Sequence, residues 1–438
     1  YERFMNEEDI TLISPHQAPG LYEAFGTEDF DDLYLKYEAD KTIPKKTVPA
    51  QDLFGDLLKE RAETGRIYIM NLDHCNSHSS FKDKVSMSNL CQEITLPTTP
   101  IQDIHDDQGE IALCILSAVN VGGLNDLSEL ESICDLSVRA LEQIIDYQDY
   151  PVKAAEVSTK KRRSLGIGYI GLAHYLAKHG AKYSDPKAWD LVDRLSEAFQ
   201  YHLLKASNNI AKEKGKCEAF DRTKYADGLL PIDHYKKDVD KIVPHKQRMA
   251  WESLRKDIAK HGLRHSTLSA QMPSESSSVV SNETNGIEPP RALLSIKKSK
   301  KGPLKQIAPG FPKLKNDYTL LWDMPSNEGY INVVAMMQKY FDQAISGNWS
   351  YNPTHFDNNE VPLSVMANDM LTAYKLGWKT SYYQNTYDFK GDDEDVQPAG
   401  IGAQLEDEGE DVILEPENAV EQINTDIIEG DDCDACTI

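Results

Sequence analysis

Glu110-Ile111-Ala112-Leu113-Cys114-Ile115-Leu116-Ser117 is a short, mostly apolar run. A run of this length followed by a helical pattern at 126–147 predicts a buried β-strand. Arg66–Asn71 is a similar run, and we predict a buried strand there too. Further helices are expected at 164–179 and 187–215. Strands that alternate with helices are typical of an α/β domain with parallel strands.

The alternation continues toward the C-terminus. The further elements that we expect are a strand at 268–272, helices at 330–346 and 361–376, and a strand at 380–384. Before Arg66, apolar residues at helical spacing over 29–65 predict a helical lead-in that occupies residues 1–65. The main body would then cover residues 66–390, with an irregular loop at about 85–100.

Composition limits the class of protein. The chain has 438 residues, 40% of them hydrophobic, which is enough to bury a large core. Its formal charge is −24 and it lacks a long basic stripe, so no nucleic-acid binding is expected. We find no apolar run of membrane-spanning length and no signal peptide, which predicts a cytoplasmic protein without membrane contact. Seven cysteines, an odd number, do not suit a secreted disulfide framework.

Residues 391–438 form a tail of different composition. They contain 17 Asp and Glu, and no Lys or Arg follows Lys390. Such a segment has too little apolar surface to offset the entropy of ordering, so we expect a disordered acidic arm. Its tip carries Cys433 and Cys436. A dithiol on a mobile arm can exchange with a buried disulfide and then be reduced by another protein, so the tail predicts a redox shuttle.

Asn89-Leu90-Cys91-Gln92-Glu93 is the strongest internal signal. In extended backbone, Asn89, Cys91 and Glu93 would project to the same side. An amide, a thiol and a carboxylate that meet in one small volume can bind a substrate, carry out sulfur chemistry and transfer protons. The alternative is an inert buried cysteine, and this alternative is stronger for Cys114, which lies alone in an apolar run. A shuttle needs an internal partner, which favours a functional role for both thiols.

Two other motifs could carry chemistry. Tyr382 and Tyr383 are either ordinary aromatic strand residues or a pair of phenols that passes an electron and a proton to a thiol. Ser274, Glu275, Ser276 and Ser277 follow the expected strand at 268–272. Hydroxyls and free backbone N–H groups at a helix N-terminus can hold a phosphate, although a simple polar turn is an equal alternative.

Two further patterns do not support a site. Gly166-Ile-Gly168-Tyr-Ile-Gly171 matches a dinucleotide-binding fingerprint, but a basic run precedes it where the fingerprint needs a buried strand. The glycines are better explained by close helix packing. His74, Cys75 and His78 do not have the spacing of a zinc finger or zinc ribbon, so no metal site is predicted.

Taken together, the motifs resemble the large, catalytic subunit of aerobic class I ribonucleotide reductase, from about residue 30 to the C-terminus. The segments that carry this resemblance are 66–76, 88–93, 109–114, 146–151, 272–278, 285–291 and 382–386. The resemblance implies the C-terminal part of a ten-stranded α/β barrel, with the loop at about 85–100 as a finger through its centre. It also implies reduction of ribonucleoside diphosphates to deoxyribonucleotides for DNA synthesis.

The resemblance also implies roles for individual residues. Cys91 would be the thiyl radical, Glu93 the general base, and Asn89 a substrate ligand. Cys114 would be one of two reducing cysteines. The other implied positions are Tyr382 and Tyr383 for radical relay, Ser274, Glu275, Ser276 and Ser277 for the substrate phosphates, and Cys433 and Cys436 for the shuttle.

Partners follow from the same resemblance. The chain itself would bind no cofactor, since a separate small subunit would supply a radical from its metal centre, and thioredoxin or glutaredoxin would supply electrons. The N-terminal half of the family pattern, with the partner cysteine of Cys114, is missing. We therefore expect a separate N-terminal half polypeptide. The alternatives are an inactive half-subunit that acts as a scaffold for the small subunit, and a simple dithiol oxidoreductase.

Overall fold

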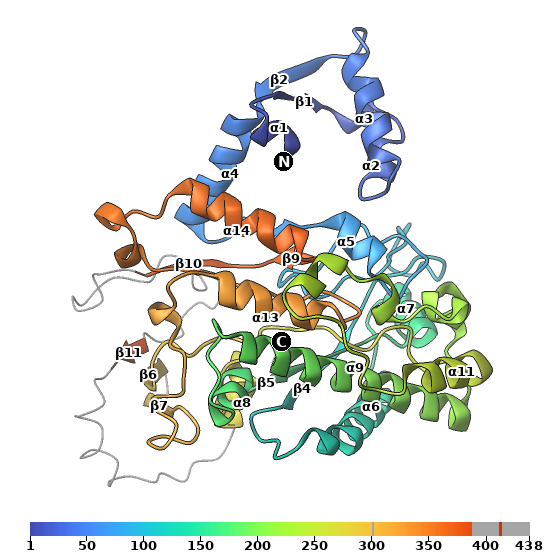
Figure 1. Ribbon diagram of the computed structural model, residues 1–438. Helices are drawn as coiled ribbons and strands as arrows, with labels where there is room; N and C mark the ends of the chain where they lie inside the picture. The colour runs from blue at the N-terminus through green and yellow to red at the C-terminus, as the bar shows by residue number, and fades with distance from the viewer. Residues whose placement is uncertain (300–301, 388–410, 414–438) are drawn as a thin grey trace.

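The structure is a computed structural model that describes residues 1–299, 302–387 and 411–413 (Figure 1). The architecture is α/β, as predicted. Most of the expected tail, with Cys433 and Cys436, lies outside the described residues. No helix in the described ranges is long and apolar enough to cross a membrane.

Parallel strands form the centre of the body. Strand β4 (Ile115–Asn120) pairs with β5 (Leu165–Ile170), with Ile115 opposite Leu165. The order continues through parallel bridges from Ile167 to Ser269 and from Gln271 to Ile345. The segment predicted as a strand at 268–272 therefore does run beside β5. Every residue of β5 is buried, which explains why this strand is apolar on both faces.

Long helices cover these strands and share one hydrophobic core with them (Figure 1). Helix α6 (Leu130–Tyr147) and helix α13 (Glu328–Gln338) both pack against α9 (Pro186–Lys214). The helices predicted at 126–147 and 187–215 are thus confirmed. In α9 the apolar side chains on one face are buried, including Phe199 and Leu203. Pro186 starts α9, where its fixed φ suits the first helical turn.

The remaining elements connect this body. The helices are α5 (Leu72–Ser77), α7 (Lys153–Arg162), α8 (Leu172–Lys178), α10 (Pro231–His234), α11 (Trp251–His261), α12 (Glu275–Val280) and α14 (Leu363–Lys375). The strands are β3 (Ile69–Met70), β6 (Leu294–Ser299), β7 (Gly302–Ile307), β8 (Trp349–Tyr351), β9 (Thr380–Ser381), β10 (Gln384–Thr386) and β11 (Asp411–Ile413). β3 pairs antiparallel with β9, β10 pairs parallel with β8, and β6 lies between β11 and β7.

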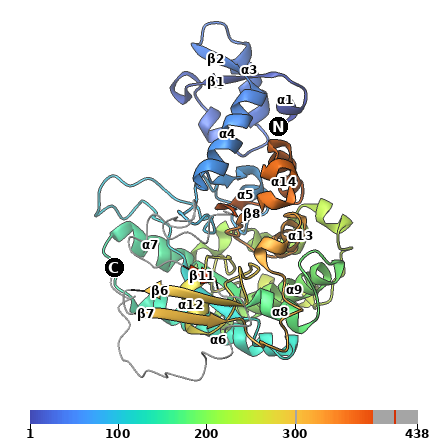
Figure 2. The same cartoon turned by 90° about the vertical axis from the view of Figure 1, so that its left-hand side faces the viewer.

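The N-terminal region projects away from the body (Figures 1 and 2). Its elements are α1 (Glu2–Met5), β1 (Asp9–Ile13), α2 (Leu21–Ala24), α3 (Phe30–Ala39), β2 (Lys45–Pro49) and α4 (Ala50–Thr64). The expectation of a purely helical lead-in is wrong, because β2 pairs antiparallel with β1. The helical spacing over 29–65 comes from two separate helices, and the intervening strand depends on a partner outside that window.

Two other predictions need correction. The helix expected at 164–179 is instead β5 followed by α8. A Cβ on Gly166 would lie 2.7 Å from the Sγ of Cys114, so this glycine allows β5 to approach the thiol rather than another helix. The chain turns at Gly171, whose φ of +81° favours glycine. The strand expected at 110–117 begins only at Ile115, which places Cys114 just before it.

Candidate active site

The finger loop, residues 85–100, contains no helix or extended strand, as predicted. Its tip is not extended, however, because a turn joins Gln92 N to Asn89 O (3.2 Å) and Gln92 has a φ of +71°. The prediction that Asn89, Cys91 and Glu93 alternate along an extended backbone is therefore wrong. The turn still connects two of the predicted groups, since a side-chain hydrogen bond of Asn89 acts on the carboxyl of Glu93.

A four-residue segment, Gln343–Ser346, holds the finger loop, and we call it the clamp. Ser346 Oγ donates to the carbonyl oxygen of Cys91 (2.5 Å) and lies 3.2 Å from Glu93 Oε2. The N–H of Ala344 donates to Glu93 O (3.0 Å). Gln343 Oε1 accepts a hydrogen bond from Thr95 N (3.2 Å). The clamp thus runs along the loop, with contacts to Thr95, Glu93 and Cys91 in that order.

Cys91 lies against the first of the two tyrosines. The hydroxyl of Tyr382 donates to Cys91 Sγ at 3.4 Å. The rings of Tyr382 and Tyr383 are 4.0 Å apart between centroids. Burial raises the pKa of the Cys91 thiol, and the negative charge of Glu93 adds to this effect. The structure therefore brings together a protonated thiol, a phenol and a second phenol in sequence.

Glu93 is buried, and desolvation raises its pKa above the usual value for a glutamate. Hydrogen bonds from Asn89 and Ser346 act in the opposite direction because they stabilise the carboxylate. A carboxyl group whose pKa is raised can exchange a proton near neutral pH more readily than an exposed one. Its surroundings therefore suit general acid–base chemistry.

Cys114 belongs to the same site. Gln343 Nε2 donates to its Sγ at 3.3 Å, so the clamp contacts both the finger loop and this thiol. Burial raises the pKa of Cys114 to about 12, and the charge of Glu93 also raises it. Among the cysteines in the described residues, Cys75, Cys134 and Cys217 are buried elsewhere as free thiols.

Residues that the sequence interpretation did not single out support the tyrosine pair. The ring of Tyr68 lies 4.8 Å from that of Tyr382 and 5.5 Å from that of Tyr383. The buried guanidinium of Arg61 donates to the carbonyl oxygen of Tyr382 (2.9 Å). The aromatic residue in the Arg66–Asn71 run was a usable signal for Tyr68, whereas Arg61 looked like part of an ordinary charged helix.

The segment Ser274–Ser277, which we call the serine loop, starts next to the clamp. Ser346 N donates to Gln271 O (2.9 Å), and the loop follows three residues later along the chain. Ser274 is buried and donates to Met272 O (3.1 Å), whereas the side chains that follow it in α12, Glu275 to Ser277, are exposed. The exposed first turn of α12 could accept an anionic group.

No group of three or more His, Cys, Asp or Glu that could hold a metal ion occurs in the part of the chain that the structure describes. His74 Nδ1 lies 2.9 Å from the carbonyl oxygen of Trp378, and Cys75 Sγ donates to Lys379 O (3.8 Å). These contacts give both side chains a structural role at the start of the body.

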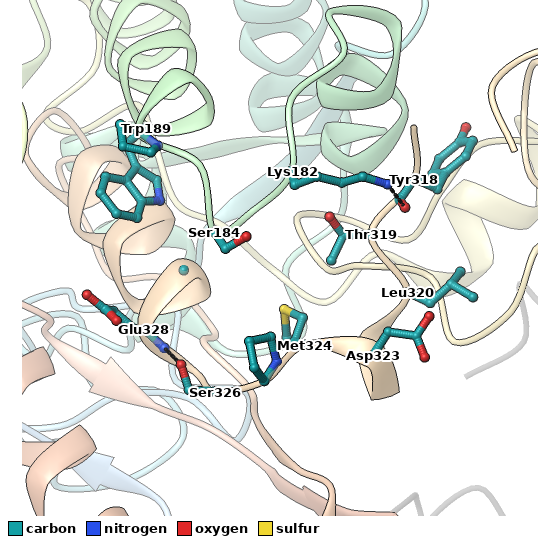
Figure 3. A pocket seen from close by; sticks show the side chains of 13 residues that line it. Lys182, Ser184, Trp189, Tyr318, Thr319, Leu320, Asp323, Met324, Ser326 and Glu328 are labelled. Atoms are coloured by element: carbon teal, nitrogen blue, oxygen red, sulfur yellow. Dashed lines mark hydrogen bonds between the residues drawn. The ribbon is translucent and has the colours of Figure 1, made fainter. Parts of the chain in front are cut away.

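A cavity of about 470 Å³ lies away from these residues, beside the N-terminus of α9 (Figure 3). None of the predicted site residues lines it. The ammonium group of Lys182 on its wall is already bonded to Asn316 O (2.7 Å), and Trp189 donates to Tyr183 O (2.8 Å). The Lys182 ammonium group and the Trp189 indole N–H on the wall are therefore engaged within the protein.

Comparison with known proteins gives a consistent result. The family model described as ribonucleotide reductase, barrel domain, matches residues 1–319 and 312–384. The ribonucleoside-diphosphate reductase subunit alpha of Haemophilus influenzae is 57% identical over 402 residues, which are 91% of this chain and 53% of the relative. Subunit alpha of reductase 1 of Escherichia coli K12 is 54% identical, with 90% and 53% covered.

A relative of lower sequence identity is matched over the same share of its length. Ribonucleoside-diphosphate reductase subunit alpha of enterobacteria phage T4 is 42% identical over 403 residues, which are 90% of this chain and 53% of the relative. The chain thus spans about half the length of the curated relatives it matches. The matching barrel model confirms the predicted fold class.

Proposed function

Since the chain belongs to the ribonucleotide reductase family through its barrel domain, we propose that it carries the thiyl-radical site that reduces ribonucleoside diphosphates to deoxyribonucleoside diphosphates. The observation that carries the proposal is the contact of 3.4 Å between the Tyr382 hydroxyl and the sulfur of Cys91, with Glu93 two residues away in the chain. The product would serve DNA synthesis.

The first step would make a radical on Cys91. A phenoxyl radical on Tyr382 would take the hydrogen atom of the Cys91 thiol, so that an O–H bond forms as the S–H bond breaks. Tyr383 would pass the radical to Tyr382, which is supported by the ring separation of 4.0 Å. The radical would come from the metal centre of a separate small subunit, so this chain would need no cofactor of its own.

The next steps would act on the ribose. The Cys91 thiyl would remove the 3′ hydrogen atom, while the carboxylate of Glu93 would accept the proton of the 3′-hydroxyl. The raised pKa of Glu93 supports this role. Asn89, which bonds Glu93, would orient the substrate. The serine loop, Ser274 to Ser277 with Glu275, would hold the diphosphate.

Reduction would also consume two thiols. Cys114 would supply one, and its place against the clamp, which also binds the Cys91 loop, supports this role. The second would come from the part of the relatives' length that lies outside the 53% matched here. Cys433 and Cys436 would then reduce the resulting disulfide and be recharged by thioredoxin or glutaredoxin.

We therefore propose that activity requires this sequence, the part of the relatives' length that it does not cover, and the small subunit. The test is reduction of cytidine diphosphate by the reconstituted complex, with thioredoxin as reductant. Cys91→Ser should lower turnover at least about a thousandfold, because no other group would remove the 3′ hydrogen.

Cys75→Ala is the matched control, since Cys75 is a buried thiol that contacts Lys379 O instead of the site. It should keep most of the turnover. If Cys91→Ser were as active as the unchanged chain, or if the complex had no reductase activity while still binding the small subunit, the scaffold alternative would replace the proposal.

A further inference from the structure

The side-chain amide of Gln343 connects three parts of the molecule. Its Oε1 accepts a hydrogen bond from Thr95 N in the finger loop (3.2 Å), and its Nε2 donates to Leu165 O at the start of β5 (3.0 Å). The same Nε2 lies 3.3 Å from Cys114 Sγ. A primary amide has one acceptor oxygen and two N–H donors, so each donor has one acceptor here.

The two backbone partners fix which end of the amide faces the sulfur. If the amide were turned over, its NH2 group would face the N–H of Thr95, and its oxygen would face the carbonyl of Leu165. Both hydrogen bonds would then be lost. Gln343 is only 1% exposed, so water could not replace them. The fold therefore stabilises the orientation in which an N–H points at Cys114.

The backbone of Gln343 is fixed as well. Its N–H donates to Ser269 O (3.0 Å). Its carbonyl accepts hydrogen bonds from Gln338 Nε2 (2.9 Å) and from Lys379 Nζ (3.0 Å). On the other side of the sulfur, Gly166 leaves room for Cys114 beside β5. The backbone that carries the donor is thus fixed by three hydrogen bonds, and β5 approaches the acceptor sulfur closely.

We propose that Gln343 is a positioning residue that holds the sulfur of Cys114 and favours its thiolate form. The inference rests on the proposed role of Cys114 as a reducing thiol. An N–H donor stabilises a thiolate more than a thiol, because a hydrogen bond to a charged acceptor is the stronger one. Burial and the charge of Glu93 have the opposite effect, since both raise the pKa of Cys114.

The hydrogen bond would act when the site is recharged. An incoming thiolate attacks the disulfide that contains Cys114, a new S–S bond forms, and the old S–S bond breaks. If Cys114 is the leaving group, it departs as a thiolate with the electron pair of that bond. A leaving thiol of lower pKa departs faster. By stabilising this thiolate, Gln343 would speed the exchange at a sulfur that burial otherwise disfavours.

The test is alkylation of Cys114 in the full chain by iodoacetamide at pH 8 to 9, with each cysteine followed by peptide mass spectrometry. Gln343→Met keeps the length of the side chain and removes the N–H donor. A weaker hold on the thiolate should raise the Cys114 pKa by roughly one unit or more, and so slow alkylation about tenfold or more. If Gln343 had only a structural role, its replacement would loosen the packing around Cys114 and speed alkylation.

Gln384→Met is the matched control, because Gln384 is a buried amide whose Nε2 bonds Met366 Sδ (3.6 Å) instead of the clamp. It should not slow alkylation of Cys114. An unchanged or faster rate in Gln343→Met would overturn the inference. If Gln343→Met does not fold, as judged by circular dichroism, Gln343→Glu replaces it.

Gln343→Glu keeps an oxygen for Thr95 N and places a second oxygen toward the sulfur, so it should slow alkylation at least as much. A rate equal to that of the unchanged chain would overturn the inference. Alkylation needs no turnover. Failure of this inference is therefore distinguishable from failure of the proposed reductase function, which the cytidine diphosphate assay measures.

Discussion

The clamp and a cluster of three histidines, His74, His78 and His234, both interact with Lys379, but they bury polar atoms in different ways. In the clamp, the side-chain polar atoms of Gln343 and Ser346 lie within hydrogen-bonding distance of partners in the loop, the sheet or Cys114. In the histidine cluster, Nε2 of His74 and of His78 and Nδ1 of His234 have no hydrogen-bond partner among the described residues.

Lys379 links the two regions. Its Nζ donates to the carbonyl oxygens of Phe341 (3.2 Å), Asp342 (2.7 Å) and Gln343 (3.0 Å), which are the two residues before the clamp and its first residue. Three acceptors match the three N–H groups of an ammonium ion. Burial nevertheless lowers the pKa of Lys379 to about 7. Its positive charge also helps to lower the pKa of all three histidines.

The difference shows two solutions to burying polar groups. Hydrogen bonding fixes the geometry of the clamp, where the proposed chemistry needs fixed distances. The histidines avoid the cost of buried charge by remaining neutral. We therefore expect substitutions in the clamp to disturb the site directly, and acid to disturb the histidine cluster first.

The largest effect should come from Lys379→Met. It would leave the carbonyl oxygens of residues 341–343 without this donor, so the free energy of unfolding should fall by about 3 kcal/mol or more. Urea unfolding followed by circular dichroism measures it. Lys375→Met, at an exposed position of α14, is the control and should change little. A loss below about 1 kcal/mol for Lys379→Met would show that the clamp does not depend on Lys379.

The next effect concerns pH. Burial lowers the pKa of His78 well below the ordinary histidine value of 6.5, and it lowers the pKa of His234 to about 3. Below pH 6.5 the unfolded chain binds protons that the folded histidines do not. Stability is therefore complete above pH 6.5 and falls as the pH drops toward 3, by up to about 1.4 kcal/mol per pH unit for each such group.

His234→Gln should make this acid slope shallower, because one of these groups no longer binds a proton on unfolding. The free energy of unfolding at pH 7, 6 and 5 measures the slope. His16→Gln, at an exposed position, should leave the slope unchanged. Equal slopes in His234→Gln and the unchanged chain would contradict the contrast between the two regions.

The smallest effect is expected for Ser346→Ala. The loss of one buried hydroxyl should lower the free energy of unfolding by about 1 kcal/mol. The hydrogen bond from Ser346 lowers the pKa of Glu93, so its removal should raise that pKa further. In the reconstituted enzyme, the acid limb of the pH–rate profile should then move to higher pH.

Ser253→Ala, on the exposed face of α11, is the control for the hydroxyl loss and should shift neither quantity. An unmoved acid limb in Ser346→Ala would mean that the clamp does not tune Glu93.

Much of the fold could be predicted from local patterns. The buried stripe of α9 and the parallel arrangement of β5 with the segment at 268–272 follow from periodicity and alternation. The prediction of a helix at 164–179 is wrong. Gly166 and Gly168 let β5 pack closely against Cys114 and Ala270, and the sequence does not show that these residues are its neighbours. The predicted tail lies largely outside the described residues and stays a prediction.

The sequence by itself determined which residue types were available for chemistry, because Cys91, Glu93 and the tyrosine pair lie in short segments with recognisable spacing. Only the tertiary structure decided how they are held. Gln343 and Ser346 lie in the last part of the helix predicted at 330–346, whereas α13 ends at Gln338. They are about 250 residues from the loop that they bind. Hydrogen bonds between segments so far apart depend on how the strands and helices pack, and no local pattern of polarity records that arrangement.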